Sequence, residues 1–190
     1  MTKDTRQLIM DTARLTVQAH GYTALSFREL AKEIGIKNAS VHYHFPTKGD
    51  LGAALAKQYS DDAQKFLNGL SLKASDAANT MRTYTDAFRA ALERQNRMCL
   101  CGIMIAERDE LPEIVKTEVD RFSATNIRWL SDFLRALDLK QIDVDSRSEA
   151  IFAAVEGAQL IARGSADIAI FDRCMDAYGK AGLFPAWKPR

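Results

Sequence analysis

Residues 35–51 read GIKNASVHYHFPTKGDL, and this stretch decides how the whole chain is interpreted. Val41 and Phe45 lie four residues apart, the spacing that places two apolar side chains on one face of a helix. The remaining residues are mostly polar or carry imidazole or phenol rings, which a fully buried segment would not tolerate. The stretch therefore predicts a short helix with one buried edge and one edge that touches a partner.

The segments on either side also predict helices. Residues 5–21 place an apolar stripe along one helical face and end at a glycine. The next segment starts with SFREL, in which Ser26 and Glu29 form a capping box. The quoted helix then runs over 38–45, and a long helix follows over 48–69.

The rest of the chain shows helical periodicity and no sustained strand alternation. A second capping box, SRSE, opens one helix at residue 146, and the tail LFPAWKPR is expected to be extended. The fold class is therefore all-α, with about nine helices. The remaining helices are expected at 74–95, 99–109, 112–138, 146–164 and 168–180.

Composition limits the class of protein. The chain has 190 residues, of which 47% are hydrophobic, so a real core is expected and disorder is not. Three cysteines and no leader-like segment favour the reducing cytoplasm, and the most apolar run, residues 98–106, is too short to span a membrane. The first 50 residues carry seven basic and five acidic side chains, a net charge of +2 in a chain whose total is +1.

Two short helices joined by a glycine-bearing turn, after a longer helix, form a helix-turn-helix. In that motif the second helix enters the major groove of DNA. Val41 and Phe45 would anchor this helix on the core. Its outer face would then offer to DNA the side chains of Lys37, Asn38, Ser40, His42, Tyr43 and His44.

Residues 21–51 resemble the DNA-binding domain of the TetR/AcrR family of transcriptional regulators. Together with the N-terminal amphipathic helix before it, the match covers about a quarter of the chain, and it depends on the order and spacing of several residues. This chain has His42 where the family often has Tyr, and Lys37 where a small capping residue is common. The residues that carry the resemblance are Gly21, Tyr22, Ser26, Ala31, Gly35, Ile36, His44, Phe45 and Lys48.

The resemblance implies a DNA-binding domain over 1–46 and a ligand-binding and dimerisation domain over 47–190. Helix starts attract anions, so Ser26, Arg28, Thr47 and Lys48, together with Tyr43 and His44, are expected at phosphates. Ser26, Thr47 and Asn38 can instead be simple helix caps. The candidates for reading bases are Lys37, Asn38, Ala39, Ser40 and His42.

The same resemblance implies an apolar inducer pocket and a homodimer formed by the last two helices. Apolar and aromatic side chains at helical spacing are consistent with a pocket, although plain core packing explains them equally well. The pocket candidates are Met81, Tyr84, Phe88, Met98, Cys101, Met104, Ile105, Phe122, Trp129 and Phe133. The interface candidates are Ala153, Ala154, Gly157, Ala158, Ala162, Phe171 and Met175.

These expectations describe a repressor that leaves a palindromic operator when a small, mostly apolar inducer binds. Two alternatives are a repressor switched by oxidation or electrophilic modification of Cys99 or Cys101, and a DNA-binding protein without a ligand. A helical enzyme using the acidic cluster at 107–110 or the histidines is disfavoured, because no nucleophile–base spacing, phosphate loop or metal motif occurs. No cofactor is expected. No metal is expected either, because His42 and His44 point about 200° apart around a helix.

Overall fold

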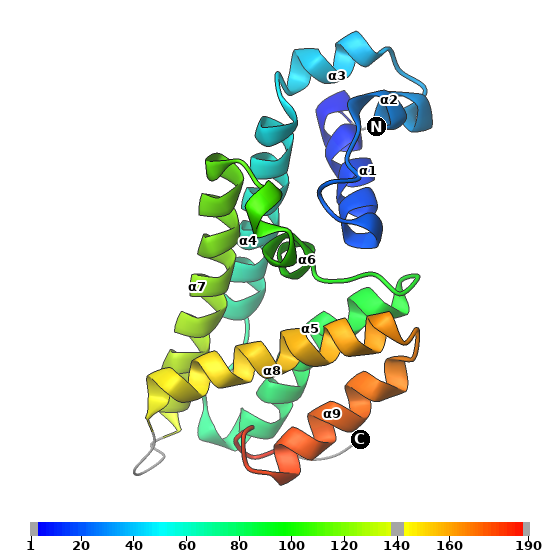
Figure 1. Cartoon of the computed structure of the whole chain (residues 1–190). Coiled ribbons are helices and arrows are strands. Elements are labelled where there is room, and N and C mark those ends of the chain that lie inside the picture. Colours follow the sequence, from blue (N-terminus) through cyan, green and yellow to red (C-terminus); the bar gives the residue numbers. More distant parts are fainter. Residues whose placement is uncertain (1–3, 138–142, 188–190) are drawn as a thin grey trace. The chain divides into compact units, whose positions relative to one another are not determined.

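The structure is a computed structural model that describes residues 4–137 and 143–187 (Figure 1). Helices account for the regular structure of these residues, which confirms the all-α expectation. Two short 3₁₀ turns, Ala74–Asp76 and Arg108–Glu110, accompany them. The nine helices in this part of the chain are α1 (Thr5–His20), α2 (Phe27–Ile34), α3 (Asn38–His44), α4 (Lys48–Asn68), α5 (Ala77–Glu93), α6 (Leu100–Ala106), α7 (Glu113–Ala136), α8 (Val144–Gly164) and α9 (Ile168–Lys180).

The described residues form two compact units. The N-terminal unit contains residues up to 62 together with 100–122, and the C-terminal unit contains 63–99 and the residues from 123 onward. Helices α4 and α7 each contribute residues to both units. The functional boundary between residues 46 and 47 stays a prediction.

In the N-terminal unit, α1 supplies the apolar face against which the next helices pack. Ile9, Ala13 and Val17 lie on this face and are fully buried. Helix α1 contacts α2, α3 and α6, and α2 also contacts α3. The turn between α2 and α3 begins at Gly35, whose φ of 77° lies in the left-handed region that glycine adopts without strain.

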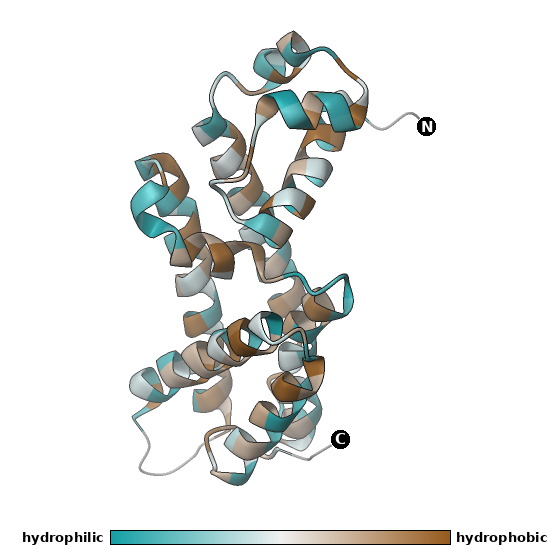
Figure 2. Cartoon of the chain, turned by 45° about the vertical axis from the view of Figure 1, so that its right-hand side comes forward, coloured by the Kyte–Doolittle hydropathy of each residue, from teal (hydrophilic) through white to brown (hydrophobic). Residues whose placement is uncertain are grey.

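In the C-terminal unit, α8 packs against α9 and α5, and α5 also contacts α9 (Figure 1). Apolar and polar segments alternate along the helices of each unit in Figure 2, as amphipathic helices require. Several polar side chains are nevertheless buried here. Gln159, on α8, is fully buried, and its amide nitrogen donates to the Phe88 carbonyl at 2.6 Å.

Two expectations about local structure were wrong. Helix α8 starts at Val144, because Asp143 accepts a hydrogen bond from the Ser146 amide and caps the helix before the SRSE segment begins. As far as residue 187 the C-terminal tail does not simply extend, because Phe184 is buried and the Trp187 indole donates to Asp176 at 3.1 Å; residues 188–190 lie outside the described part. Among the helices described, none has the length and hydropathy needed to cross a membrane.

Candidate nucleic-acid interface

Helix α3 is held on the N-terminal unit by its apolar edge. Val41 has no exposed surface, and Phe45, directly after the helix, is 2% exposed. The guanidinium of Arg6, on α1, lies over the Phe45 ring at 4.9 Å from its centre. The buried edge inferred from the spacing of Val41 and Phe45 is thus present.

The other edge of α3 faces solvent. Lys37, Asn38, Ala39 and His42 are exposed, and Tyr43 is 85% exposed. Ser40 and His44 are half-buried, and the His44 ring packs edge-on against Tyr43 with 5.2 Å between ring centres. The Tyr43 ring and hydroxyl are therefore free to contact a partner.

Asn38 is not the cap of α3. The cap position is Lys37, and no side chain makes a capping hydrogen bond there. Asn38 is the first helical residue, and it is exposed. This position suits the reading of a base edge, the role that the sequence predicts for it.

His42 is positioned by two contacts. Its ring packs edge-on against Phe27, with 4.9 Å between ring centres. Its Nδ1 atom lies 3.4 Å from the Pro46 carbonyl oxygen. When Nδ1 donates to that carbonyl, Nε2 is left as an acceptor on the exposed side.

The starts of α2 and α4 are both capped by hydroxyl side chains. Ser26 accepts a hydrogen bond from the Glu29 amide at 3.5 Å, and Arg28 beside it is exposed. Thr47 donates through its hydroxyl to the Asp50 carboxylate at 2.7 Å, and the Asp50 amide donates back to the hydroxyl at 3.1 Å. Both hydroxyls therefore serve as caps, and a phosphate at Thr47 would have to compete with the Asp50 carboxylate.

Lys48 is held by the segment between α1 and α2. Its ammonium donates to the Thr23 carbonyl at 3.0 Å and lies over the Tyr22 ring, 4.6 Å from the centre. Burial lowers the pKa of Lys48, and the negative charge of Glu107 opposes this shift. The positive charge of Lys48 therefore lies at the start of α4. The same contacts with Thr23 and Tyr22 also stabilise the turn before α2.

Glu107 is a positioning residue that the sequence analysis missed. Its carboxylate accepts a hydrogen bond from the Tyr22 amide, and it fills the space where a side chain at Gly21 would begin. Gly21 has a φ of 88°, so glycine is needed there for conformation as well as for space. Its position in the acidic cluster 107–110 gives no sign of this role.

The ten predicted inducer contacts are divided between the two units. Met81, Tyr84, Phe88, Met98, Trp129 and Phe133 belong to the C-terminal unit, and Cys101, Met104, Ile105 and Phe122 to the N-terminal unit. All are buried except Ile105, which is 37% exposed.

Three of these side chains form one stack. Trp129 lies between Tyr84 and Phe133, with ring centres 5.2 and 5.5 Å away and nearly parallel planes. The structure therefore brings Tyr84, Trp129 and Phe133 together, and Phe88 packs against Tyr84 as well. The contact of any of these ten residues with an inducer remains a prediction.

The predicted dimer residues differ in accessibility. Four of them are buried within the protomer, so their side chains can stabilise the helices of an interface but cannot contact a partner subunit themselves. These are Ala158, Ala162, Phe171 and Met175. Ala153 is exposed, and Ala154 and Gly157 are half-buried. The exposed large apolar side chains of α8, Leu160 at 51% and Ile161 at 57%, are not among the predicted interface residues.

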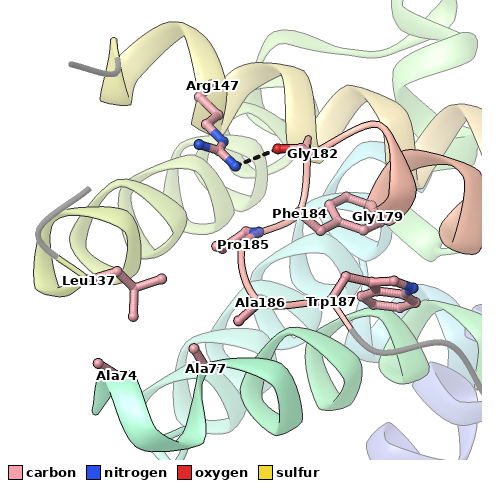
Figure 3. Close-up of a pocket in the computed structure, with 10 residues that line it drawn as sticks. All are labelled: Ala74, Ala77, Leu137, Arg147, Gly179, Gly182, Phe184, Pro185, Ala186 and Trp187. Atoms are coloured by element: carbon pink, nitrogen blue, oxygen red, sulfur yellow. Dashed lines mark hydrogen bonds between the residues drawn. The ribbon is translucent and has the colours of Figure 1, made fainter. Parts of the chain in front are cut away.

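The C-terminal segment forms one wall of a surface hollow of about 490 Å³ (Figure 3). Arg147 donates to the carbonyls of Gly182 at 2.7 Å and Leu183 at 3.0 Å, and burial lowers its pKa. Phe184 and Trp187 line the same hollow. None of the ten predicted inducer contacts lines this hollow. The two hydrogen bonds of Arg147 hold the C-terminal segment in place.

The described residues show no group of three or more His, Cys, Asp or Glu side chains arranged to hold a metal ion. The three cysteines are not in disulfides: Cys99 and Cys101 are buried, and Cys174 is half-buried. Burial gives the first two little access to a reactive solute.

Comparison with known proteins agrees with this geometry. The family "Bacterial regulatory proteins, tetR family" matches residues 9–55. A TetR transcriptional regulator from Legionella pneumophila is 29% identical, with a TM-score of 0.85 over 95% of this chain and 98% of its own. A TetR-family transcriptional regulator from Agrobacterium tumefaciens is 28% identical, with a TM-score of 0.84 over 94% of this chain and 95% of its own.

A regulatory protein TetR from Rhodobacter sphaeroides shares the fold at 22% identity, with a TM-score of 0.83 over 92% of this chain and 96% of its own. No curated protein matches the chain significantly.

Proposed function

The chain belongs to the TetR/AcrR family of transcriptional regulators, and on this premise we propose that it is a homodimeric repressor released from a palindromic operator by a small, mostly apolar inducer. It is a DNA-binding regulator and not an enzyme. The observation that carries the proposal is the two-sided character of α3, with Val41 and Phe45 buried and Tyr43 exposed.

The exposed side chains of α3 divide into two roles. Lys37, Asn38 and His42 present donors and acceptors suited to base edges in the major groove, and Ala39 and Ser40 complete that surface. Tyr43 and His44, with Arg28 and Lys48 near the starts of α2 and α4, suit phosphates. Ser26 and Thr47 contribute mainly by capping these two helices.

A single short helix reads too few base pairs for useful specificity, so two copies are needed on one face of DNA. A two-fold dimer bound to a palindrome holds its recognition helices about one helical turn, ~34–36 Å, or a multiple of it, apart. Leu160 and Ile161 on α8, with Ala153 two turns before Leu160 on the same face, supply the exposed apolar surface for such a dimer.

The inducer acts by favouring a state in which the two recognition helices have the wrong spacing. Helix α4 begins at Lys48, beside the DNA-binding helices, and its last residues belong to the C-terminal unit, so one continuous helix links the two functions. A 100-fold preference of the inducer for the released state corresponds to only about 2.7 kcal/mol.

Selection from a pool of random DNA duplexes tests the proposal. The wild-type protein should enrich a palindrome whose half-sites lie about 10–10.5 bp apart or a multiple of this, and the complex should contain an even number of chains. His42→Ala should relax preference at one position in each half-site, at a cost of ~1–3 kcal/mol. Enrichment of no sequence, or a single chain on each specific site, would reject the proposed function.

A matched variant separates base reading from general charge. Lys32→Ala removes one positive charge from an exposed position of α2 that carries no predicted contact. It should leave the selected sequence unchanged. If His42→Ala instead weakens every sequence equally, His42 contacts the backbone or only packs against Phe27.

A further inference from the structure

Helix α8 carries a carboxylate into the interior of the C-terminal unit. Both carboxylate oxygens of Glu156 are buried, and neither receives a hydrogen bond that meets normal geometry from the described residues. The neighbouring Cys99 thiol, a weak donor, lowers the pKa of Glu156, but burial outweighs it and raises this pKa to about 7. Buried acceptors are normally satisfied, so this one requires an explanation.

The donors around Glu156 are committed elsewhere. The Tyr84 hydroxyl, whose pKa is raised by burial and by the charge of Glu156, donates to Asn126 at 3.3 Å. The Gln159 amide nitrogen donates to the Phe88 carbonyl at 2.6 Å, and the Cys99 backbone amide donates to the Gln159 oxygen at 2.9 Å. These three buried groups therefore have partners within the protein, whereas the Glu156 carboxylate is left for a donor from outside.

Aromatic rings surround the same region. Tyr84, which interacts electrostatically with Glu156, forms one end of the stack with Trp129 and Phe133. The faces of aromatic rings attract cations and accept flat rings by stacking. A carboxylate beside such a stack combines an acceptor for N–H groups with a surface for an aromatic ring. An anionic ligand would be repelled, and a neutral one would gain less.

We propose that Glu156 is the polar recognition group of an inducer site in the C-terminal unit, and that the inducer is a small aromatic organic cation bearing N–H donors, such as an amidinium or a protonated amine. This inference rests on the proposed function and adds the ligand class. The carboxylate pairs with the cationic head, and the ring inserts against Trp129, which keeps 7% of its surface exposed while Tyr84 and Phe133 are fully buried. The Glu156 residue as a whole is half-buried, although both of its carboxylate oxygens are buried.

The pairing predicts a proton exchange. Below pH 7 the buried carboxyl group holds its proton, and a cation pairs with it best after that proton has left. Cation binding should therefore release a proton to the buffer and become tighter as pH rises through about 7. Tyr84 and Cys99 are the titratable groups that interact with Glu156, and Tyr84 stays protonated in this range.

Three probes of the same shape test the charge requirement: benzamidinium, benzamide and benzoate, which carry charges of +1, 0 and −1. Calorimetric titration of the full-length protein at pH 8 should give at least tenfold tighter binding of benzamidinium than of the other two. Glu156→Gln should remove this preference. Glu149→Gln, which removes a carboxylate from an exposed position of the same helix, should keep it.

The outcomes are decisive in either direction. Equal affinity for the three probes, binding of none of them, or an unchanged preference in Glu156→Gln would overturn the inference. If Glu156→Gln does not fold, titration of the wild type at several pH values replaces it. Benzamidinium binding that releases no proton below pH 7 would then reject the site.

DNA binding, measured in parallel on the selected duplex, distinguishes this inference from the proposed function. If benzamidinium binds through Glu156 without weakening DNA binding, the site stands and the inducer mechanism fails. If a compound without positive charge releases the DNA equally from wild type and Glu156→Gln, the repressor stands and the assignment of Glu156 fails.

Discussion

Helices α3 and α8 distribute their polar and apolar side chains in opposite ways. Helix α3 buries Val41 and exposes its polar residues, and its large exposed ring belongs to Tyr43. Helix α8 buries Gln159 and the carboxylate of Glu156 while it exposes Leu160 and Ile161. A polar exterior on a short helix suits a polyanionic partner, whereas an apolar exterior with a polar interior suits a protein partner outside and a ligand inside.

The largest effect is expected at the exterior of α8. The double substitution Leu160→Glu and Ile161→Glu places four carboxylates at a two-fold interface, and like charges there cost several kcal/mol. The dimer should dissociate at least about 100-fold more readily, and specific DNA binding should be lost with it. Analytical ultracentrifugation measures the dissociation constant.

Ile114→Glu is the control for this experiment, because it changes an apolar side chain of α7 that is similarly exposed, at 50%. It should leave the assembly intact. An unchanged dissociation constant in the double variant would place the interface elsewhere. The exposed apolar surface of α8 would then not be the surface that meets a second copy of the chain.

The next effect concerns the interior of α8. The pKa of Glu156 in the folded protein, about 7, lies above its usual value of 4.5. Between these values the folded protein keeps a proton that the unfolded chain has lost, so stability falls as pH rises through this window and levels off above it. Glu156→Gln should therefore be more stable than the wild type at pH 8, by on the order of 3 kcal/mol, and no more stable at pH 4.

Urea unfolding at both pH values measures this difference. Glu149→Gln should show no such pH-dependent gain in stability over the wild type, because Glu149 is exposed on the same helix. If the two variants gave the same pH profile, the Glu156 carboxylate would have to be solvated or paired in solution.

The exterior of α3 is tested by Tyr43→Ala. The side chain is 85% exposed, so its loss should change the free energy of unfolding by less than about 0.5 kcal/mol. Affinity for the selected DNA should fall by ~1–2 kcal/mol, because a phosphate contact is lost. Fluorescence anisotropy on labelled DNA measures it.

Tyr43→Phe keeps the ring and removes the hydroxyl. If the hydroxyl donates to a phosphate, the two variants should lose similar affinity. A large loss of stability in Tyr43→Ala would mean that α3 depends on this ring for packing. The outer face of α3 would then not be wholly available to contact DNA.

The smallest effect is expected for Lys48→Ala. The variant should reduce the dependence of DNA affinity on salt by about one unit of slope, uniformly across DNA sequences. It should also destabilise the protein by about 1 kcal/mol, because the bond to Thr23 and the contact with Tyr22 are lost. Lys32→Ala should leave stability unchanged, and an unaltered salt slope in Lys48→Ala would restrict Lys48 to a structural role.

Local sequence signals predicted most of the helices. Gly21 and Gly35 marked the ends of α1 and α2, and the spacing of Val41 and Phe45 predicted which edge of α3 is buried. Local signals failed where two of them competed. Asp143 and Ser146 are both good caps, and only the folded structure shows that the first one is used.

Contacts between distant residues lay beyond such signals. Glu107 meets the Tyr22 amide from 85 residues away, so no local pattern connects them. The docking of Phe184 and Trp187 likewise depends on helices that the tail sequence does not specify. Glu156 left one trace, a single charge among the small and apolar residues of FAAVEGAQL, but its burial follows only from the packing of α8 against α5.

The chain has two tryptophans, Trp129 in the aromatic stack and Trp187 in the docked C-terminal segment, and both belong to the C-terminal unit. Indole emission is therefore a reporter for that unit alone, while the helices that meet DNA give no signal of this kind. Unfolding followed by indole emission and unfolding followed by circular dichroism need not coincide. A lag between the two curves measures how independently the C-terminal and N-terminal units lose their structure.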